Sequence, residues 1–253
     1  MYRDPSPPVS SGAAPSSGTR DDLVARLFRL TNHLSIDLLG GPRPWKLAWV
    51  VNAQKALMLP FLLALAWWAG DNSAPAWTYV ALHGGYGLVW LLKDVAFPDA
   101  RWQVRVTIPA AIATWAAVLG WYALFGWLMF ALPPRRYPIV EAHWLALCAG
   151  LCIVGVAVMI ASDAQKTFTL RAKPGLITDG MFRYVRHPNY TGEMMIYASF
   201  AMLIQHWLPW LVLAWVWGLV FLPSMAMKER SLSRHPGWEA YRARTRWVLP
   251  GLL

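Results

Sequence analysis

Charged residues are scarce in this chain. Only 14% of its 253 residues are Asp, Glu, Lys or Arg, and 57% are hydrophobic, whereas a soluble domain usually has about 25% charged residues. So few charges cannot cover the surface of a water-soluble domain, and hydrophobic runs extend over most of the chain. The composition therefore predicts a membrane protein built as one bundle.

Cysteine is also rare, because the chain has only Cys148 and Cys152, one helical turn apart inside an apolar run. Two such residues exclude a disulfide framework, and we expect them to be buried structural thiols. The sequence has no HExxH, CxxC or EF-hand pattern, so no metal site is expected.

Acidic residues are fewer than basic ones, at 13 against 23, and the net charge is +10. Such a charge can indicate nucleic-acid binding. Here the basic residues lie between hydrophobic runs, which is typical of loops that face anionic cytoplasmic lipid. We therefore expect membrane lipid, and no nucleic acid, as a partner.

The hydrophobic runs are long enough to predict transmembrane helices, which need about 20 apolar residues each. Candidate spans lie at 46–69, 76–92, 108–131, 142–162, 190–206 and 208–226. The last two are separated by so short a loop that a tight helical hairpin is expected. The predicted fold is an all-α, multi-pass transmembrane bundle of about six spans.

The N-terminal region differs in composition from the rest of the chain. Residues 1–20 are rich in Ser, Pro, Gly and Ala and predict a disordered tail. Residues 21–45 form an amphipathic segment that is suited to the membrane surface. Residues 46–253 are expected to form a single membrane domain.

The distribution of basic residues predicts the orientation. With an even number of crossings, twenty of the 23 Lys and Arg residues fall on one side of the membrane, together with both termini. The other side has only Arg135 and Arg136, and Lys55 lies inside a span. This bias places both termini in the cytoplasm.

Most polar candidates occur in SDAQKTFTLRAKPGLITDGMFRYVRHPNYTGE, residues 162–193, between two spans. Asp163, Asn189, Tyr190 and Glu193 lie at span boundaries, where such groups are costly without partners. The helix that begins near Asn189 would favour an anion at its N-terminus. These residues therefore suggest a binding site on the cytoplasmic side.

The arginines of this segment and its neighbour have two interpretations. Arg171 and Arg186 can form charge-assisted bonds to phosphate, or they can be topology signals only. A second basic stretch, KERSLSRHPGWEAYRARTR at 228–246, lies at the other end of the hairpin. Together the two segments can form a basic, aromatic-bearing pocket for a nucleotide.

The order of these motifs resembles a known family. Ser162 and Asp163, a Leu-Arg pair, G-x-F-x-Y-V and then N-Y-x-G-E are similar to the C-terminal region of the steroid 5α-reductase family and its bacterial relatives. The ending T-R-x-V-L-P resembles that family's C-terminus. RHP-x-Y-x-G is also shared with sterol reductases and with isoprenylcysteine and phospholipid methyltransferases. The resemblance covers about residues 155–253.

The resemblance implies an NADPH-dependent oxidoreductase that reduces a C=C bond in a lipophilic enone or steroid-like substrate. It also implies a substrate half at 46–140 and a cofactor half at 141–253, with the cofactor reached from the cytoplasm. The implied cofactor-binding residues are Asp163, Arg171, Arg186, His187, Asn189, Tyr190, Glu193, Glu229, Tyr241 and Arg246. A family arginine before G-x-F is missing, with Gly175 near its place and Lys173 as a stand-in, so NADH stays open.

The membrane half should carry an acid, because enone reduction needs a group that polarises the carbonyl. The resembled family uses a Gln-Glu pair and a Tyr, but here Gln54 is followed by Lys55. Lys55 inside a span is either a functional residue or a lysine whose amine reaches the interface. Tyr86 and His83, in LHGGYG, are candidate acids, and an interfacial role for Tyr86 is the alternative.

Two other functions stay open at this point. The first is a methyltransferase that uses S-adenosylmethionine on a lipid or prenylated substrate, which RHP-x-Y-x-G and Glu229 would support. The second is a non-enzymatic lipid-binding or scaffold protein.

Overall fold

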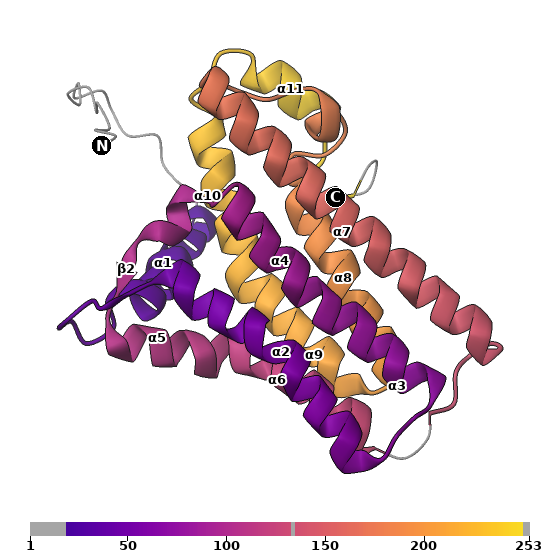
Figure 1. The fold of residues 1–253 in the computed structure, drawn as a ribbon. Helices are drawn as coiled ribbons and strands as arrows, with labels where there is room; N and C mark the ends of the chain where they lie inside the picture. Colours follow the sequence, from indigo (N-terminus) through magenta and orange to yellow (C-terminus); the bar gives the residue numbers. More distant parts are fainter. Residues whose placement is uncertain (1–18, 133–134, 250–253) are drawn as a thin grey trace.

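In the computed structural model, which describes residues 19–132 and 135–249, the chain forms a bundle of long helices that run between two ends (Figure 1). The described residues contain only two short strands, β1 (Trp45–Lys46) and β2 (Arg105–Val106), which pair antiparallel. The all-α fold class is therefore confirmed. Of the tail expected at residues 1–20, residues 1–18 lie outside the described part.

Several long helices contain a π-helical turn that divides them into two labelled elements. The first half of the chain forms α1 (Thr19–Asn32) with a π-helical turn at His33–Asp37, α2 (Leu47–Ala69), α3 (Ala74–Tyr79), α4 (Gly85–Ala96), α5 (Ile108–Thr114) and α6 (Gly120–Ala131). The second half forms α7 (Glu141–Ala172), α8 (Pro188–Ile204), α9 (Trp207–Val216), α10 (Leu222–Leu232) and α11 (Trp238–Arg244). The turns Val80–Gly84, Trp115–Leu119 and Trp217–Phe221 join α3 to α4, α5 to α6 and α9 to α10.

Four of the described helices are long and apolar enough to cross a membrane. They are Leu47–Ala69, Ile108–Ala131, Glu141–Ala172 and Trp207–Leu232. The other two expected spans, 76–92 and 190–206, are helices of the same bundle, but α4 carries Lys93 and Asp94 near its end at Ala96, and α8 has only 17 residues. The count of six spans therefore stays a prediction.

Close packing of α7 against α8 forms the centre of the second half of the chain. A methyl group on Gly192 would lie 2.5 Å from the backbone oxygen of Gly155, so the two helices touch through small residues, as membrane helices often do. Cys148 and Cys152 are free and buried in this part of the core, which confirms their predicted structural place.

The expected hairpin between the last two long helices is confirmed. Helix α8 ends at Ile204 and α9 begins at Trp207. Gln205 takes a left-handed conformation with φ 53°, which is a common way to end a helix and reverse the chain. The turn lies at the same end of the bundle as α3 (Figure 1).

The basic segments meet at the opposite end, which also holds α1, the end of α10 and α11 (Figure 1). The backbone N–H of Arg186 donates to the oxygen of Arg246 at 2.8 Å, and Lys46 donates to Gln103 at 3.1 Å. Arg135 instead contacts the last carbonyls of α6, at the far end. This arrangement agrees with the predicted basic asymmetry, whereas the cytoplasmic placement of both termini stays a prediction.

Candidate functional site

A cavity of about 730 Å³ lies at the basic end of the bundle, between the loop after α4, the end of α7, the start of α8 and α10. Its volume is in the range of about 300–1,000 Å³ that is usual for small-molecule sites. We call it the basic cavity. The cations that line it are Arg101, Lys166, Arg171, Arg186 and Lys228. Among its described lining residues, Asp99 is the single carboxylate.

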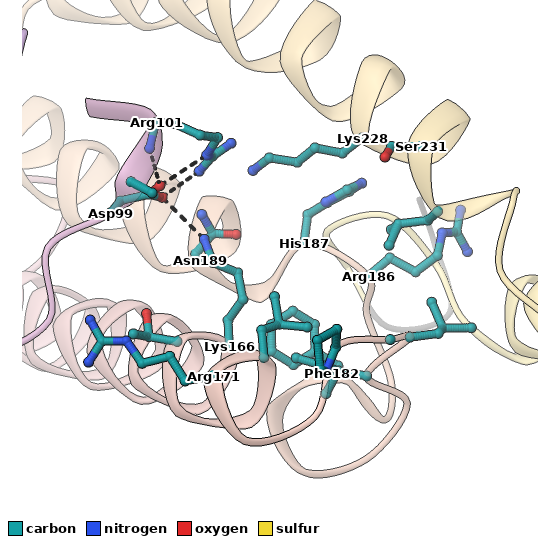
Figure 2. Close-up of a pocket in the computed structure, with 18 of the residues that line it drawn as sticks. Asp99, Arg101, Lys166, Arg171, Phe182, Arg186, His187, Asn189, Lys228 and Ser231 are labelled. Atoms are coloured by element: carbon teal, nitrogen blue, oxygen red, sulfur yellow. Dashed lines mark hydrogen bonds and ion pairs between the residues drawn. The ribbon is translucent and has the colours of Figure 1, made fainter. Parts of the chain in front are cut away.

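Asp99 connects two of these cations (Figure 2). Its carboxylate accepts from Arg101 at 2.7 Å and from Lys166 at 3.3 Å. Burial would raise the pKa of Asp99, but the hydrogen bonds from Arg101 and the charge of Lys166 lower it well below its usual range. Asp99 is therefore an anion that neutralises only part of the charge around the cavity.

Arg186 and His187 are fixed by a buried network at the edge of the cavity. The Nε of Arg186 donates to both carboxylate oxygens of Glu229 at 3.0 and 2.9 Å, and its terminal nitrogen donates to the backbone oxygen of Thr245 at 2.6 Å. The Nε2 of His187 lies 3.0 Å from Glu229. Burial lowers the pKa of His187 below its usual value, against the opposing effect of Glu229. The network joins the start of α8 to the C-terminal segment.

Two cations of the basic cavity form no ion pair with a described carboxylate. Arg171 forms no ion pair with a described residue and only stacks near the Phe168 ring, at 5.8 Å. Lys228 donates to the Tyr190 hydroxyl at 3.2 Å, and Figure 2 shows its side chain extended toward Arg101. These cations, together with the N-terminus of α8, make this cavity suitable for a ligand with several negative charges.

A second cavity of about 510 Å³ lies deeper in the bundle. We call it the aromatic cavity, because its wall carries the rings of Phe28, Tyr86, Trp90, Trp102, Tyr122, Tyr190, Tyr197 and Phe221. Phe28 and Asn32 of α1, with Ile36 of the turn that follows it, line one side. The amphipathic N-terminal segment therefore helps to enclose an apolar site.

Lys55 is the buried cation of the aromatic cavity, with 4% of its surface exposed. Its Nζ donates to the Tyr197 hydroxyl at 2.7 Å. The same atom lies 4.5 Å from the ring centre of Tyr86, 5.3 Å from Trp90, 5.6 Å from Tyr122 and 5.4 Å from Tyr197. We call these four rings the lysine cage. The amine is thus held away from water next to two phenol groups, Tyr86 and Tyr197.

The two cavities adjoin, because they share lining residues. The shared residues are Asp99, Arg101, Asn189, Lys228 and Ser231. A ligand that fills the basic cavity can therefore meet a ligand in the aromatic cavity at Asn189. This arrangement places a polar and an apolar site against each other at one point.

Asp163 and Glu193 line the aromatic cavity and are absent from the wall of the basic one. Asp163 forms a buried ion pair with Lys93 and lies 3.8 Å from Lys166. It therefore holds two lysines between the cavities. Glu193 faces the same interior from α8, and Tyr190 lies one turn before it.

Four predicted residues line neither cavity: Gln54, His83, Glu229 and Arg246. Gln54 is buried, and its amide has no hydrogen-bond partner among the described residues. His83 is buried against Phe200, and its Nδ1 lies 2.7 Å from the Tyr79 hydroxyl. Glu229 accepts hydrogen bonds from Arg186 and lies 3.0 Å from the Nε2 of His187.

Arg246 is exposed, and it contacts the site through its backbone oxygen, which accepts from the backbone N–H of Arg186. The other candidates line a cavity: Tyr86, Lys55, Asp163, Tyr190 and Glu193 the aromatic one, Arg171, Arg186, His187 and Tyr241 the basic one, and Asn189 both. The structure therefore brings most of the predicted residues to two adjoining sites.

The sequence reasoning missed several residues of these sites. Tyr197 could have been found, because it lies one helical turn after Glu193 on α8. Lys166 likewise follows Asp163 by three residues on α7. Asp99 and Arg101 had no such signal, since they lie in a short loop whose partners come from other helices.

Comparisons with known proteins agree with the C-terminal resemblance. Residues 128–246 match the model of a family described as a protein of unknown function (DUF1295), which lies in the steroid 5α-reductase-like superfamily. An uncharacterized protein of Schizosaccharomyces pombe is 44% identical over 41 residues, which cover 16% of this chain and 15% of that relative. No solved structure matches. From α7 to α11, the chain is therefore similar to that family, and this region supplies most of the basic cavity.

Proposed function

We propose that the protein is a membrane-bound reductase that uses a nicotinamide cofactor to reduce a C=C bond conjugated to a carbonyl in a lipophilic substrate. The observation that carries this proposal is the junction of the two cavities at Asn189, Arg101 and Lys228. A reaction between a charged cofactor and an apolar substrate needs such a junction. The basic end would face the cytoplasm, where positive loops accumulate.

The basic cavity fits a dinucleotide with several phosphates. Arg171 and Lys228 would bind phosphate oxygens, because neither forms an ion pair with a described carboxylate. Leu176, Ile177 and Phe182 add an apolar wall suited to a base. When bound, the cofactor would supply the hydride.

The excess of positive charge favours NADPH, which carries one more phosphate than NADH. Lys173, the predicted stand-in for the missing family arginine, does not line the cavity. Arg171 lies two residues before it and does line the cavity, so we assign the extra phosphate to Arg171. S-adenosylmethionine fits this charge less well, because its sulfonium is itself a cation and Glu229 is already bound by Arg186.

The aromatic cavity would hold the substrate with its carbonyl at the lysine cage. The Tyr86 hydroxyl and the Lys55 ammonium would polarise the carbonyl oxygen and stabilise negative charge that develops on it. Removal of water from this cavity strengthens that effect. Glu193 and Tyr197 complete the polar surface at this point.

The test is nucleotide oxidation by the purified, detergent-solubilised protein with a panel of lipophilic enones and enals. We expect Tyr86→Phe to lower the turnover rate by about 10²–10⁴-fold, as for loss of a general acid, with nucleotide binding retained. Tyr184→Phe is the matched control, because Tyr184 is 62% exposed and lines neither cavity. The absence of NADPH or NADH oxidation with every enone and enal would contradict the proposal.

A further inference from the structure

Lys55 has an unusual environment for a buried cation. Buried ammonium groups are commonly held by a carboxylate in direct contact, but Lys55 forms no such contact with a described residue. The carboxylate of Glu193 lies in the same cavity wall and acts on Lys55 only through its charge. The hydrogen-bond partner of the amine is the neutral Tyr197 hydroxyl, at 2.7 Å. The amine therefore has bonding capacity left for a ligand in the aromatic cavity, which it lines.

The surroundings of the amine suit covalent chemistry with a carbonyl group. A lysine that is desolvated in an apolar pocket is the kind that acts as a nucleophile toward carbonyl carbon. The four rings of the lysine cage surround the amine. Their faces stabilise a positive charge on the nitrogen, either before or after reaction.

We propose that Lys55 forms a Schiff base with a lipophilic aldehyde, and that the substrates of the aromatic cavity are therefore conjugated enals. For an enal, the covalent C=N bond replaces the polarisation of the carbonyl oxygen by the Lys55 ammonium. The Nζ lone pair bonds to the carbonyl carbon, and the carbonyl oxygen leaves as water. The ammonium and the aldehyde thus give a protonated C=N group and one water molecule, with no oxidant or reductant. Tyr197, hydrogen-bonded to Nζ, and Glu193, in the same cavity wall, would move the protons.

The reduction step of this proposal rests on the proposed function, whereas Schiff-base formation does not. The positive C=N group withdraws electrons from the conjugated C=C bond. The C=C carbon farther from the nitrogen (the far carbon) therefore becomes a better hydride acceptor than in a neutral enal. Hydride addition to the far carbon gives an enamine, and a proton delivered to the carbon next to the nitrogen-bearing carbon by Tyr197 or Glu193 converts it into the saturated Schiff base. Hydrolysis of this Schiff base by one water molecule releases the saturated aldehyde and restores Lys55. The covalent bond also fixes the C=C bond at a constant distance from the junction at Asn189.

The experiment traps the Schiff base without any nucleotide. The full-length protein in detergent is incubated with dodecanal and sodium cyanoborohydride, and peptides are mapped by mass spectrometry. Dodecanal has no C=C bond, so it cannot add to amines by conjugate addition. We expect the dodecyl adduct on Lys55 in preference to Lys173, which is exposed. Labelling of Lys173 with none on Lys55 would overturn the proposal.

Two variants sharpen the result. Lys55→Arg keeps the positive charge and should lose this adduct, and Tyr197→Phe should slow its formation. If Lys55→Arg does not fold, the peptide map of the unaltered protein still decides the question. An unlabelled Lys55 in a protein that oxidises NADPH with enones would refute the Schiff base alone. A labelled Lys55 in a protein that binds no nucleotide would refute the proposed function alone.

Discussion

Replacing Glu229 with Gln tests whether this carboxylate serves the fold or a ligand. The side chains of Arg186 and Glu229 are only 5% and 13% exposed. Gln keeps the shape of Glu but removes its charge, so the buried guanidinium loses its counter-ion. Breaking a buried pair in this way costs about 3–5 kcal/mol of folding free energy.

This cost can be measured by thermal denaturation of the detergent-solubilised protein. One kcal/mol corresponds to about 2–4 °C for a chain of 150–250 residues, so Glu229→Gln should lower the Tm by about 6–20 °C. Glu239→Gln is the matched control, because Glu239 is exposed on α11. Its effect should stay within about 0.5 kcal/mol.

The opposite pattern would refute the reasoning. If Glu229→Gln melted like the Glu239→Gln control but no longer bound its cofactor, the carboxylate would act on the ligand. The methyltransferase alternative would then gain support over the reductase.

Three further predictions concern the cavity, the helix packing and the pH dependence. Arg171→Ala should weaken NADPH binding by about 10–150-fold, which corresponds to about 1.5–3 kcal/mol for a hydrogen bond to a charged group, without lowering the Tm of the ligand-free protein. Titration with NADPH measures the Kd, and thermal denaturation measures the Tm. Gly192→Ala should lower the Tm by overpacking worth about 1–3 kcal/mol, because its methyl group would lie 2.5 Å from the oxygen of Gly155; equal melting would contradict the α7–α8 contact. The pKa of His187 is lowered in the folded state, so its contribution to stability is complete above about pH 6.5 and is lost as the pH falls through the lower, folded pKa. The Tm should therefore drop on acidification below about pH 6.5, and less so in His187→Gln.

The sequence predicted the parts of this protein that depend on local pattern. Apolar runs predicted the helices, and the short connection before Trp207 predicted the hairpin. The polar run that contains Asn189 predicted the basic cavity, because its residues follow one another through the end of α7 and the start of α8. Signals of this kind lie within one or two neighbouring elements.

The other features depend on contacts between distant elements. The bond from Lys55 to Tyr197 joins residues 142 positions apart, so the sequence showed a lysine in a span but not its aromatic surroundings. Glu229 and Arg186 are 43 positions apart. The sequence showed both as charges in basic segments, and only their contact shows that one satisfies the other.

The most direct test of the central claim is thermal stabilisation of the detergent-solubilised protein by NADPH, NADH and S-adenosylmethionine in parallel. A ligand that binds only the folded protein adds about 2.7 kcal/mol at 100 times its Kd, which corresponds to a Tm increase of about 5–11 °C. The two-cavity account predicts this increase with NADPH, and a smaller increase in Arg171→Ala at the same NADPH concentration. Stabilisation by S-adenosylmethionine alone, or by none of the three, would contradict it.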